Sequence, residues 1–137
     1  MAAIAVGIAK GAAAAAHKYA AERYQGGKQI EEHPAIKMLI AGAEAAIAAA
    51  EATIYSLQEG GLTSFKGLKK SAAAKLTVIE LCSRAVTDCL QTFGGYGYVE
   101  DFGMEKRLRD ITVLKSASGS PTYLKQLIFD IEKEGVL

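Results

Sequence analysis

The chain has 137 residues, enough for one hydrophobic core and too few for two. Sixteen basic residues stand against fifteen acidic ones, so the net charge of +1 gives no electrostatic reason to expect nucleic acid or an anionic membrane as partner. Half of the residues are apolar but only 7% are aromatic, and Ala makes up the difference. We therefore treat residues 1–137 as one domain whose core is formed by closely packed helices.

The cysteines and the apolar runs bear on the cellular compartment. Cys82 and Cys89 lie in one predicted helix, about 10 Å apart, which is too far for a disulfide. Without a CxxC motif or clustered His, they are typical of reduced core residues in a reducing compartment. Lys, Glu or Arg interrupts every apolar stretch, so we expect no membrane-spanning segment. The Ala-rich start lacks a basic region and carries Lys10, which argues against a signal peptide.

Two helices are predicted in the first half of the chain. An Ala-rich helix covers about residues 2–25 and ends at Gly26-Gly27, because Ala favours helix and Gly commonly stops it. A second helix begins at His33-Pro34 and ends at Gly60-Gly61. Its apolar residues recur at steps of three and four, as in an amphipathic helix. They are Ile36, Ile40, Ala43, Ile47, Ala50, Ile54 and Leu57.

The second half continues the helical pattern. Residues 62–70 read as a loop with a basic tail, and a third helix follows and stops at Gly94-Gly95. Shorter helices are predicted over 104–114 and 123–134, separated by a turn over 116–121. No segment alternates with period two for long enough to predict a strand. Four principal helices with short connections predict an all-α fold, an antiparallel four-helix bundle.

Taken singly, the conspicuous residues indicate structure rather than chemistry. The glycines after residue 93 follow no strand and lack G-x-G-x-x-G spacing, so they read as a helix stop. His17 and His33 have no second ligand at metal spacing. The serines at 116, 118 and 120 have no evident base and read as turn residues. A short charged stretch is typical of an ion-pair network and holds Glu105, Arg107, Arg109 and Asp110.

Four motifs in a fixed order resemble the C-terminal helical domain of the acyl-CoA dehydrogenase family. One is QTFGGYGY at 91–98, followed by MEKRLRD at 104–110, similar to the family's Q-x-F-G-G-x-G and E-[KR]-x-x-R-D. The stretch ERYQGGK at 22–28 resembles E-R-x-Q-F-G-K, and EHPAI at 32–36 resembles E-H-Q-A-I. Residues 5–11 resemble the start of that domain. The similarity spans nearly the whole chain.

This resemblance implies an enzyme of three parts: an N-terminal helical domain, a β-domain and this four-helix bundle. FAD lies between the β-domain and the bundle, and it also meets the bundle of a neighbouring subunit. Carried over by position, Arg23 contacts the diphosphate or adenine end of FAD across the dimer interface, where Arg offers a fixed fork of donors. Ser120 falls where the family often has a Thr close to FAD. The remaining residues implied at the cofactor are Gln25, Gln91, Gly94 and Gly95.

Two departures from the family pattern bear on function. Gly26 replaces the aromatic residue of R-x-Q-F-G, which removes a packing surface for the cofactor. Ser118 stands at the Glu of the family's Q-I-Y-E-G-T, the base that removes the α-proton of the acyl-CoA. A hydroxyl without an activating partner cannot act as that base near neutral pH. Some family members place the base near the start of the first helix, a position that falls before Met1.

The resemblance implies an oxidoreductase that oxidises a CoA thioester at its α,β carbons and passes electrons through FAD to an electron-transfer flavoprotein. In it the chain supplies homo-oligomer contacts and part of the FAD site, in the cytoplasm or a mitochondrial matrix. The chain alone is expected to be inactive, because the β-domain is absent and Ser118 replaces the base. The alternative is a non-catalytic structural or interaction bundle, with or without a catalytic partner chain. A relative with altered chemistry is a third reading.

Overall fold

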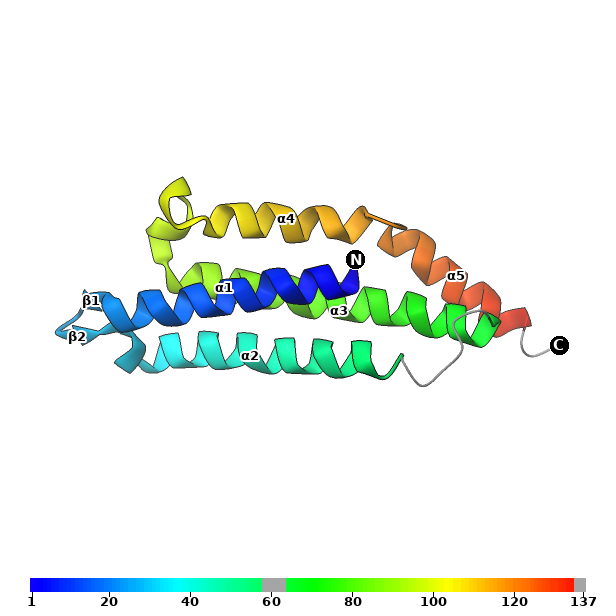
Figure 1. Cartoon of the computed structure of the whole chain (residues 1–137), viewed down its shortest axis with the longest axis horizontal. Coiled ribbons are helices and arrows are strands. Elements are labelled where there is room, and N and C mark those ends of the chain that lie inside the picture. Colours follow the sequence, from blue (N-terminus) through cyan, green and yellow to red (C-terminus); the bar gives the residue numbers. More distant parts are fainter. Residues whose placement is uncertain (58–63, 135–137) are drawn as a thin grey trace.

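The fold is a bundle of long helices, seen in a computed structural model that describes residues 1–57 and 64–134. The first four helices form the bundle, each antiparallel to the one before it, and the third spans nearly its full length (Figure 1). The predicted all-α fold and antiparallel four-helix bundle are confirmed. The helices in the described residues are α1 (Ala2–Glu22), α2 (Pro34–Tyr55), α3 (Phe65–Thr92), α4 (Met104–Ser116) and α5 (Pro121–Glu134).

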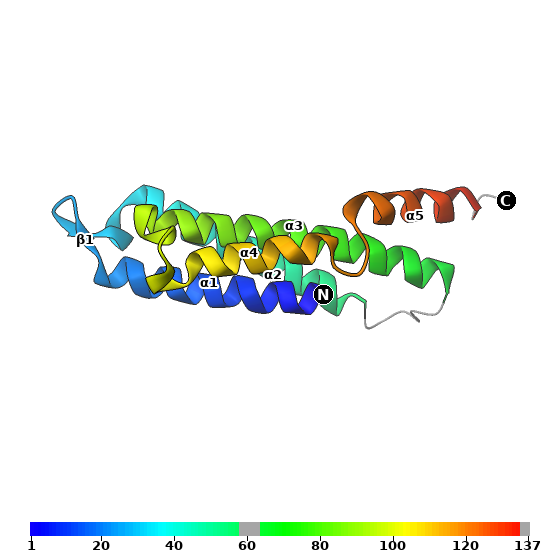
Figure 2. The same cartoon turned by 90° about the horizontal axis from the view of Figure 1, so that it is seen from above.

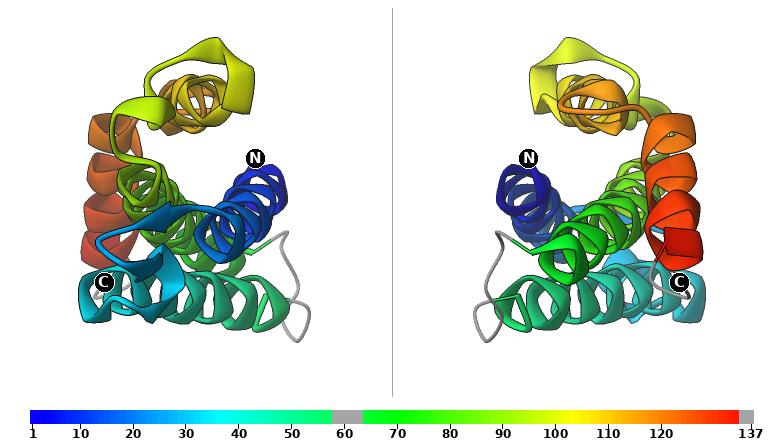
Figure 3. Two further views of the ribbon diagram at one scale, coloured as in Figure 1. Left: turned by 90° about the vertical axis from the view of Figure 1, so that its left-hand side faces the viewer. Right: turned by 90° about the vertical axis from the view of Figure 1, so that its right-hand side faces the viewer.

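The core is mostly Ala on α1, a mixture of Ala and Ile on α2, a mixture of small and larger residues on α3, and larger residues on α4. The buried face of α1 is nearly all Ala, so its neighbours approach closely. End-on views place α3 between the other helices (Figure 3), and α3 packs against each of them. The fully buried larger side chains are Val78, Cys82, Val86, Cys89, Met104 and Ile111. Both cysteines are free, as predicted.

A tight hairpin joins α1 to α2 and corrects the prediction that the first helix reaches residue 25. Strands β1 (Tyr24–Gln25) and β2 (Lys28–Gln29) pair antiparallel. Gly26 and Gly27 between them have φ of +65° and +83°, the two positive values that a type I′ hairpin requires. A single 3₁₀ turn, η1 (Ile30–Glu32), leads into α2. Two-residue strands are too short to produce an alternating pattern, which is why no strand was expected.

The start of α3 also differs from the sequence-based prediction. The helix begins at Phe65, so the lysines predicted for a loop over 62–70 belong to its first two turns. Ser64 caps it, because its hydroxyl accepts a hydrogen bond from the backbone N–H of Gly67 at 3.1 Å. The predicted end of the second helix at Gly60-Gly61 lies outside the described residues. The last two helices are each slightly longer than predicted.

Helix α2 corrects the expectation that no segment of the chain is apolar enough to span a membrane. Among the described residues it is the helix long and apolar enough to cross a membrane by length and composition, so the expectation that charges exclude such a stretch was too strict. In this fold α2 packs against α1 and α3. Of its most apolar 18-residue window, 28% is buried.

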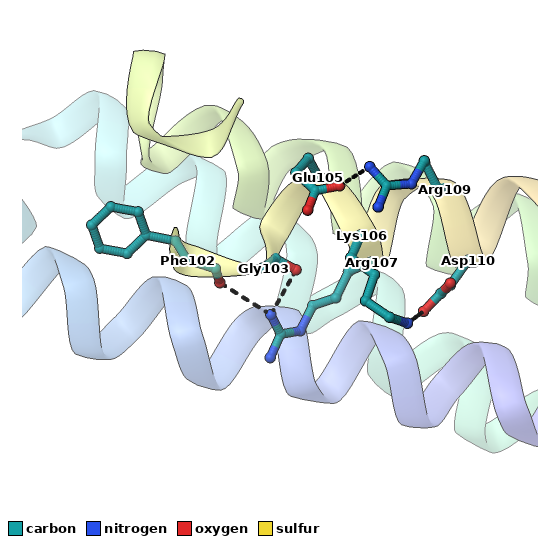
Figure 4. A network of polar contacts seen from close by, with 7 residues as sticks. All are labelled: Phe102, Gly103, Glu105, Lys106, Arg107, Arg109 and Asp110. Carbon is teal, nitrogen blue, oxygen red and sulfur yellow. Dashed lines mark hydrogen bonds and ion pairs between the residues drawn. The ribbon is translucent and has the colours of Figure 1, made fainter. Parts of the chain in front are cut away.

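The charged stretch on α4 divides into surface pairs and one inward-facing Arg (Figure 4). Arg109 pairs with Glu105 one helical turn away, as an ion-pair network predicts, whereas Asp110 pairs at 2.5 Å with Lys106, which that prediction did not include. Arg107 instead donates to the backbone carbonyls before α4, including Gly103 at 3.0 Å. This Arg therefore ties the start of α4 to the turn before it.

Candidate functional site

A cavity of about 480 Å³ opens at the hairpin end of the bundle. Its walls come from the end of α1, the hairpin, the start of α2 and the end of α3. These segments meet at one end of the bundle (Figure 1). Four of the six residues predicted at a cofactor line it together, although they are far apart in the sequence. They are Arg23, Gln25, Gln91 and Gly94.

Arg23 places a cation in this cavity, and one nitrogen of its guanidinium group has no hydrogen-bond partner. Its Nε is buried without a hydrogen-bond partner. Within residues 1–57 and 64–134, its side chain makes no hydrogen bond and no ion pair, and its guanidinium carbon lies 5.2 Å from the centre of the Tyr96 ring. An unpaired buried cationic nitrogen costs free energy, so this arrangement favours an anionic ligand.

The hairpin forms one wall of the cavity and is held by His33. The Nε2 of His33 donates to the backbone carbonyl of Gln25 at 3.0 Å. A Cβ added to Gly26 would lie 3.2 Å from the His33 ring, at a φ that disfavours any side chain. The family pattern has an aromatic residue at the position of Gly26. In this structure Gly26 lies in a tight turn, and the His33 ring packs against that turn.

Aromatic rings stand behind the cavity. Tyr19 and Phe93 line it and stack at 4.3 Å between ring centres. Phe102 packs edge-on against Tyr19 at 5.5 Å and against Tyr96 at 5.7 Å. Such offset and edge-on contacts fix ring positions. The cavity is thus backed by a cluster that joins α1, the end of α3 and the turns before α4.

The paired glycines after α3 leave open space beside the backbone. Gly94 has φ +56°, and a Cβ on either Gly94 or Gly95 would meet no heavy atom within 4 Å. A ligand can therefore approach this backbone closely. Gly95 follows Gly94 in the 3₁₀ turn η2 (Gly94–Gly97) but is not part of the cavity wall.

Ser118 and Ser120 lie at the other end of α4, in the loop before α5, so the structure does not bring Ser120 to Arg23. The Ser120 hydroxyl accepts a hydrogen bond from the backbone N–H of Tyr123 at 3.2 Å and caps α5. Ser118 is exposed, has φ of 57°, and its hydroxyl makes no hydrogen bond within the described part of the chain. Nothing described here would activate it as a base.

Lys75 holds this loop, and sequence reasoning missed it. Its Nζ donates to the carbonyl of Ala117 at 2.5 Å and also to that of Gly119, so it brackets Ser118. Burial lowers the pKa of Lys75. Lys75 also lines a second cavity, of about 430 Å³, together with Lys115 and Lys125. No spacing rule predicts the Lys75 contacts, because α3 and the loop meet only in the fold.

Comparison with known proteins places the chain in a family. A family model described as "Acyl-CoA dehydrogenase, C-terminal domain" matches residues 1–130. Cyclohexane-1-carbonyl-CoA dehydrogenase of Syntrophus aciditrophicus is 35% identical over 120 residues, which are 88% of this chain and 31% of that protein.

Solved structures show the same relationship. Butyryl-CoA dehydrogenase from Megasphaera elsdenii matches with a TM-score of 0.85 and 27% identity, over 96% of this chain and 34% of that one. A chain from the structure of the electron transferring flavoprotein of Acidaminococcus fermentans matches with a TM-score of 0.84 and 30% identity, over 99% and 35%. The chain thus spans about a third of the proteins that it matches. It belongs to the acyl-CoA dehydrogenase family, whose C-terminal domain it represents.

Proposed function

We propose that the cavity at the hairpin end binds the diphosphate of FAD, and that the chain is the cofactor-contacting bundle of an oxidoreductase acting on a CoA thioester. The observation that carries this proposal is the buried, unpartnered Nε of Arg23 in a cavity that also holds Gln25, Gln91 and Gly94. A guanidinium with free donors suits a diphosphate, which offers several acceptor oxygens.

The other residues fit the same ligand. The amides of Gln25 and Gln91 offer both donors and acceptors toward phosphate or adenine. The open backbone at Gly94 admits close approach, and the stacked pair of Tyr19 and Phe93 gives an apolar wall. When bound, FAD supplies hydride acceptance, and this chain's residues orient its nucleotide end. Gly95 and Ser120 would serve the cofactor from outside this cavity.

The complete enzyme implied here has further parts. We propose that it forms a homo-oligomer, draws the rest of its FAD site from additional domains or a catalytic partner chain, and passes electrons to an electron-transfer flavoprotein. The resemblance to a chain from an electron transferring flavoprotein structure supports that partner. The two free, buried cysteines suit a reducing compartment, the cytoplasm or a mitochondrial matrix.

A second candidate function has its own observation in Ser118. The position that carries the family's base holds an exposed hydroxyl with no partner in the described residues. A bundle of this kind could bind the nucleotide and stabilise an assembly without removing the α-proton. In that case the chain is a structural subunit that has kept the cofactor cavity.

The visible absorbance spectrum tests the first proposal. The purified chain is mixed with FAD, freed of excess cofactor by gel filtration and scanned. We expect a retained flavin band in the unmodified chain, a strongly reduced band in Arg23→Gln, and an unchanged band in Arg84→Gln, whose side chain is exposed on α3. An Arg23→Gln variant that retains the full band contradicts the cavity assignment, and a colourless unmodified chain contradicts the retention of FAD by this bundle alone.

A further inference from the structure

Arg23 depends on an aromatic ring rather than on an acid. Its guanidinium carbon lies 5.2 Å from the centre of the Tyr96 ring, within the range of a cation–π contact. Across residues 1–57 and 64–134 its side chain has no carboxylate or hydrogen-bond partner. Tyr96 is not part of the cavity wall. Tyr96 therefore affects the binding of a ligand in the cavity indirectly, through the position of Arg23.

We propose that Tyr96 is a positioning residue that holds Arg23 ready for a nucleotide diphosphate, an inference that rests on the proposed function. A ring fixes a guanidinium through its face and leaves the N–H donors at its edge free for phosphate oxygens. A carboxylate partner would occupy those donors and neutralise the charge. The aromatic contact thus orders a flexible cation while keeping its full charge for the ligand.

The ring is itself held in place. Tyr96 packs against Phe102 at 5.7 Å and lies 6.5 Å from Tyr19, ring centre to ring centre. Its backbone N–H bonds the carbonyl of Phe93 at 3.2 Å, inside the turn that follows α3. Tyr96 therefore links the aromatic cluster behind the cavity to Arg23 within it.

The position of Tyr96 predicts an effect that depends on the phosphate groups of the ligand. If Tyr96 acts through Arg23, its loss weakens binding of ADP and leaves the binding of adenosine, which has no phosphate, unchanged. A purely structural role would weaken both ligands together. The ratio of the two affinities therefore separates positioning from a general loss of packing.

Isothermal titration calorimetry with ADP and adenosine tests this on the whole chain. We expect Tyr96→Leu to weaken ADP roughly three- to tenfold, since a cation–π contact is modest in strength, with adenosine unchanged. Tyr96→Phe keeps the ring and should bind ADP within about twofold of the unmodified chain. Tyr98→Leu is the matched control, because Tyr98 is 86% exposed two residues away.

Two results would overturn the proposal: equal ADP affinity in Tyr96→Leu and the unmodified chain, or equal losses for ADP and adenosine. If Tyr96→Leu does not fold, Phe102→Leu removes the edge-on support of the ring and should reduce the ADP-to-adenosine ratio in the same direction. An unchanged ratio there also contradicts the proposal. Failure of the unmodified chain to bind ADP refutes the proposed function itself.

Discussion

The two ends of the bundle, which Figure 2 shows from above, differ in packing and in the chemistry that they carry. At the hairpin end, residues from α1, α2 and α3 enclose the cavity, and Met104 of α4 is fully buried in the main core. At the other end, α5 packs on α3 and buries Leu124, which lies outside that core. The groups suited to a nucleotide thus lie at the hairpin end, where three helices meet around the cavity. Ser118, which the resemblance places at the family's base, lies on a loop at the other end.

Truncating one buried side chain at each end gives the largest expected contrast. We expect Met104→Ala to lower the free energy of unfolding by about 2–5 kcal/mol, because a cavity would open in a region enclosed on all sides. Leu124→Ala should cost less, because water can reach the space that it leaves. Urea unfolding followed by circular dichroism measures both. A larger loss for Leu124→Ala would contradict the proposed difference in packing.

Gly97 tests how tightly the turn at the hairpin end is packed. A Cβ at this position would lie 2.8 Å from the backbone carbonyl oxygen of Leu90. Gly97→Ala is therefore expected to cost about 1–3 kcal/mol in thermal or urea unfolding. Gly95→Ala is the control, since a Cβ there meets nothing within 4 Å. Equal stability of the two variants would show that the turn is looser than described.

The buried thiols report the same packing through pH. Burial raises the pKa of Cys82 to about 11 and that of Cys89 to about 12 from an ordinary 9.0. The unfolded thiols ionise first, so their stabilising contribution is present below pH 9 and is lost as the pH rises toward 11 to 12. At pH 10 the loss is on the order of 1 kcal/mol per thiol. The free energy of unfolding is measured at pH 8 and pH 10 for the unmodified chain and for a Cys82→Ala, Cys89→Ala double variant. We expect the unmodified chain to lose more stability at pH 10. The same loss in both proteins would argue against buried thiols.

The smallest expected effect concerns the loop that holds Ser118. Lys75→Met removes the donor that bonds the carbonyls of Ala117 and Gly119, at a cost of about 1 kcal/mol. Hydrogen exchange should accelerate at the start of α5 and stay unchanged in the hairpin over 24–29. Lys70→Met on an exposed position of the same helix is the control. Exchange that accelerates equally at both ends would contradict the independence of the two regions.

The sequence predicted the elements that depend on local pattern. The apolar spacing from Ile36 to Ile54 and the stops at Gly26-Gly27 and Gly94-Gly95 define α2 and the ends of α1 and α3 with small errors. The type I′ hairpin was read as a helix stop, because paired glycines serve both purposes. The early start of α3 was missed because a Lys-rich stretch resembles a loop, whereas Ser64 and the packing of α5 make it helical.

The site was less accessible to sequence reasoning. Resemblance named Arg23, Gln25, Gln91 and Gly94, and the fold brings these four to one cavity. No pattern indicated that Tyr96 lies over Arg23 or that Lys75 reaches the loop before α5. Such contacts depend on how helices far apart in the sequence approach one another, and a one-dimensional pattern carries no such information.

A two-dimensional NMR titration of the chain with ADP tests the central claim that nucleotide recognition resides at the hairpin end. We predict shifts of backbone amides around Arg23, His33 and Gly94, with the amides of residues 115–125 unchanged. Shifts concentrated in residues 115–125, or no shifts at saturating ADP, would contradict the account.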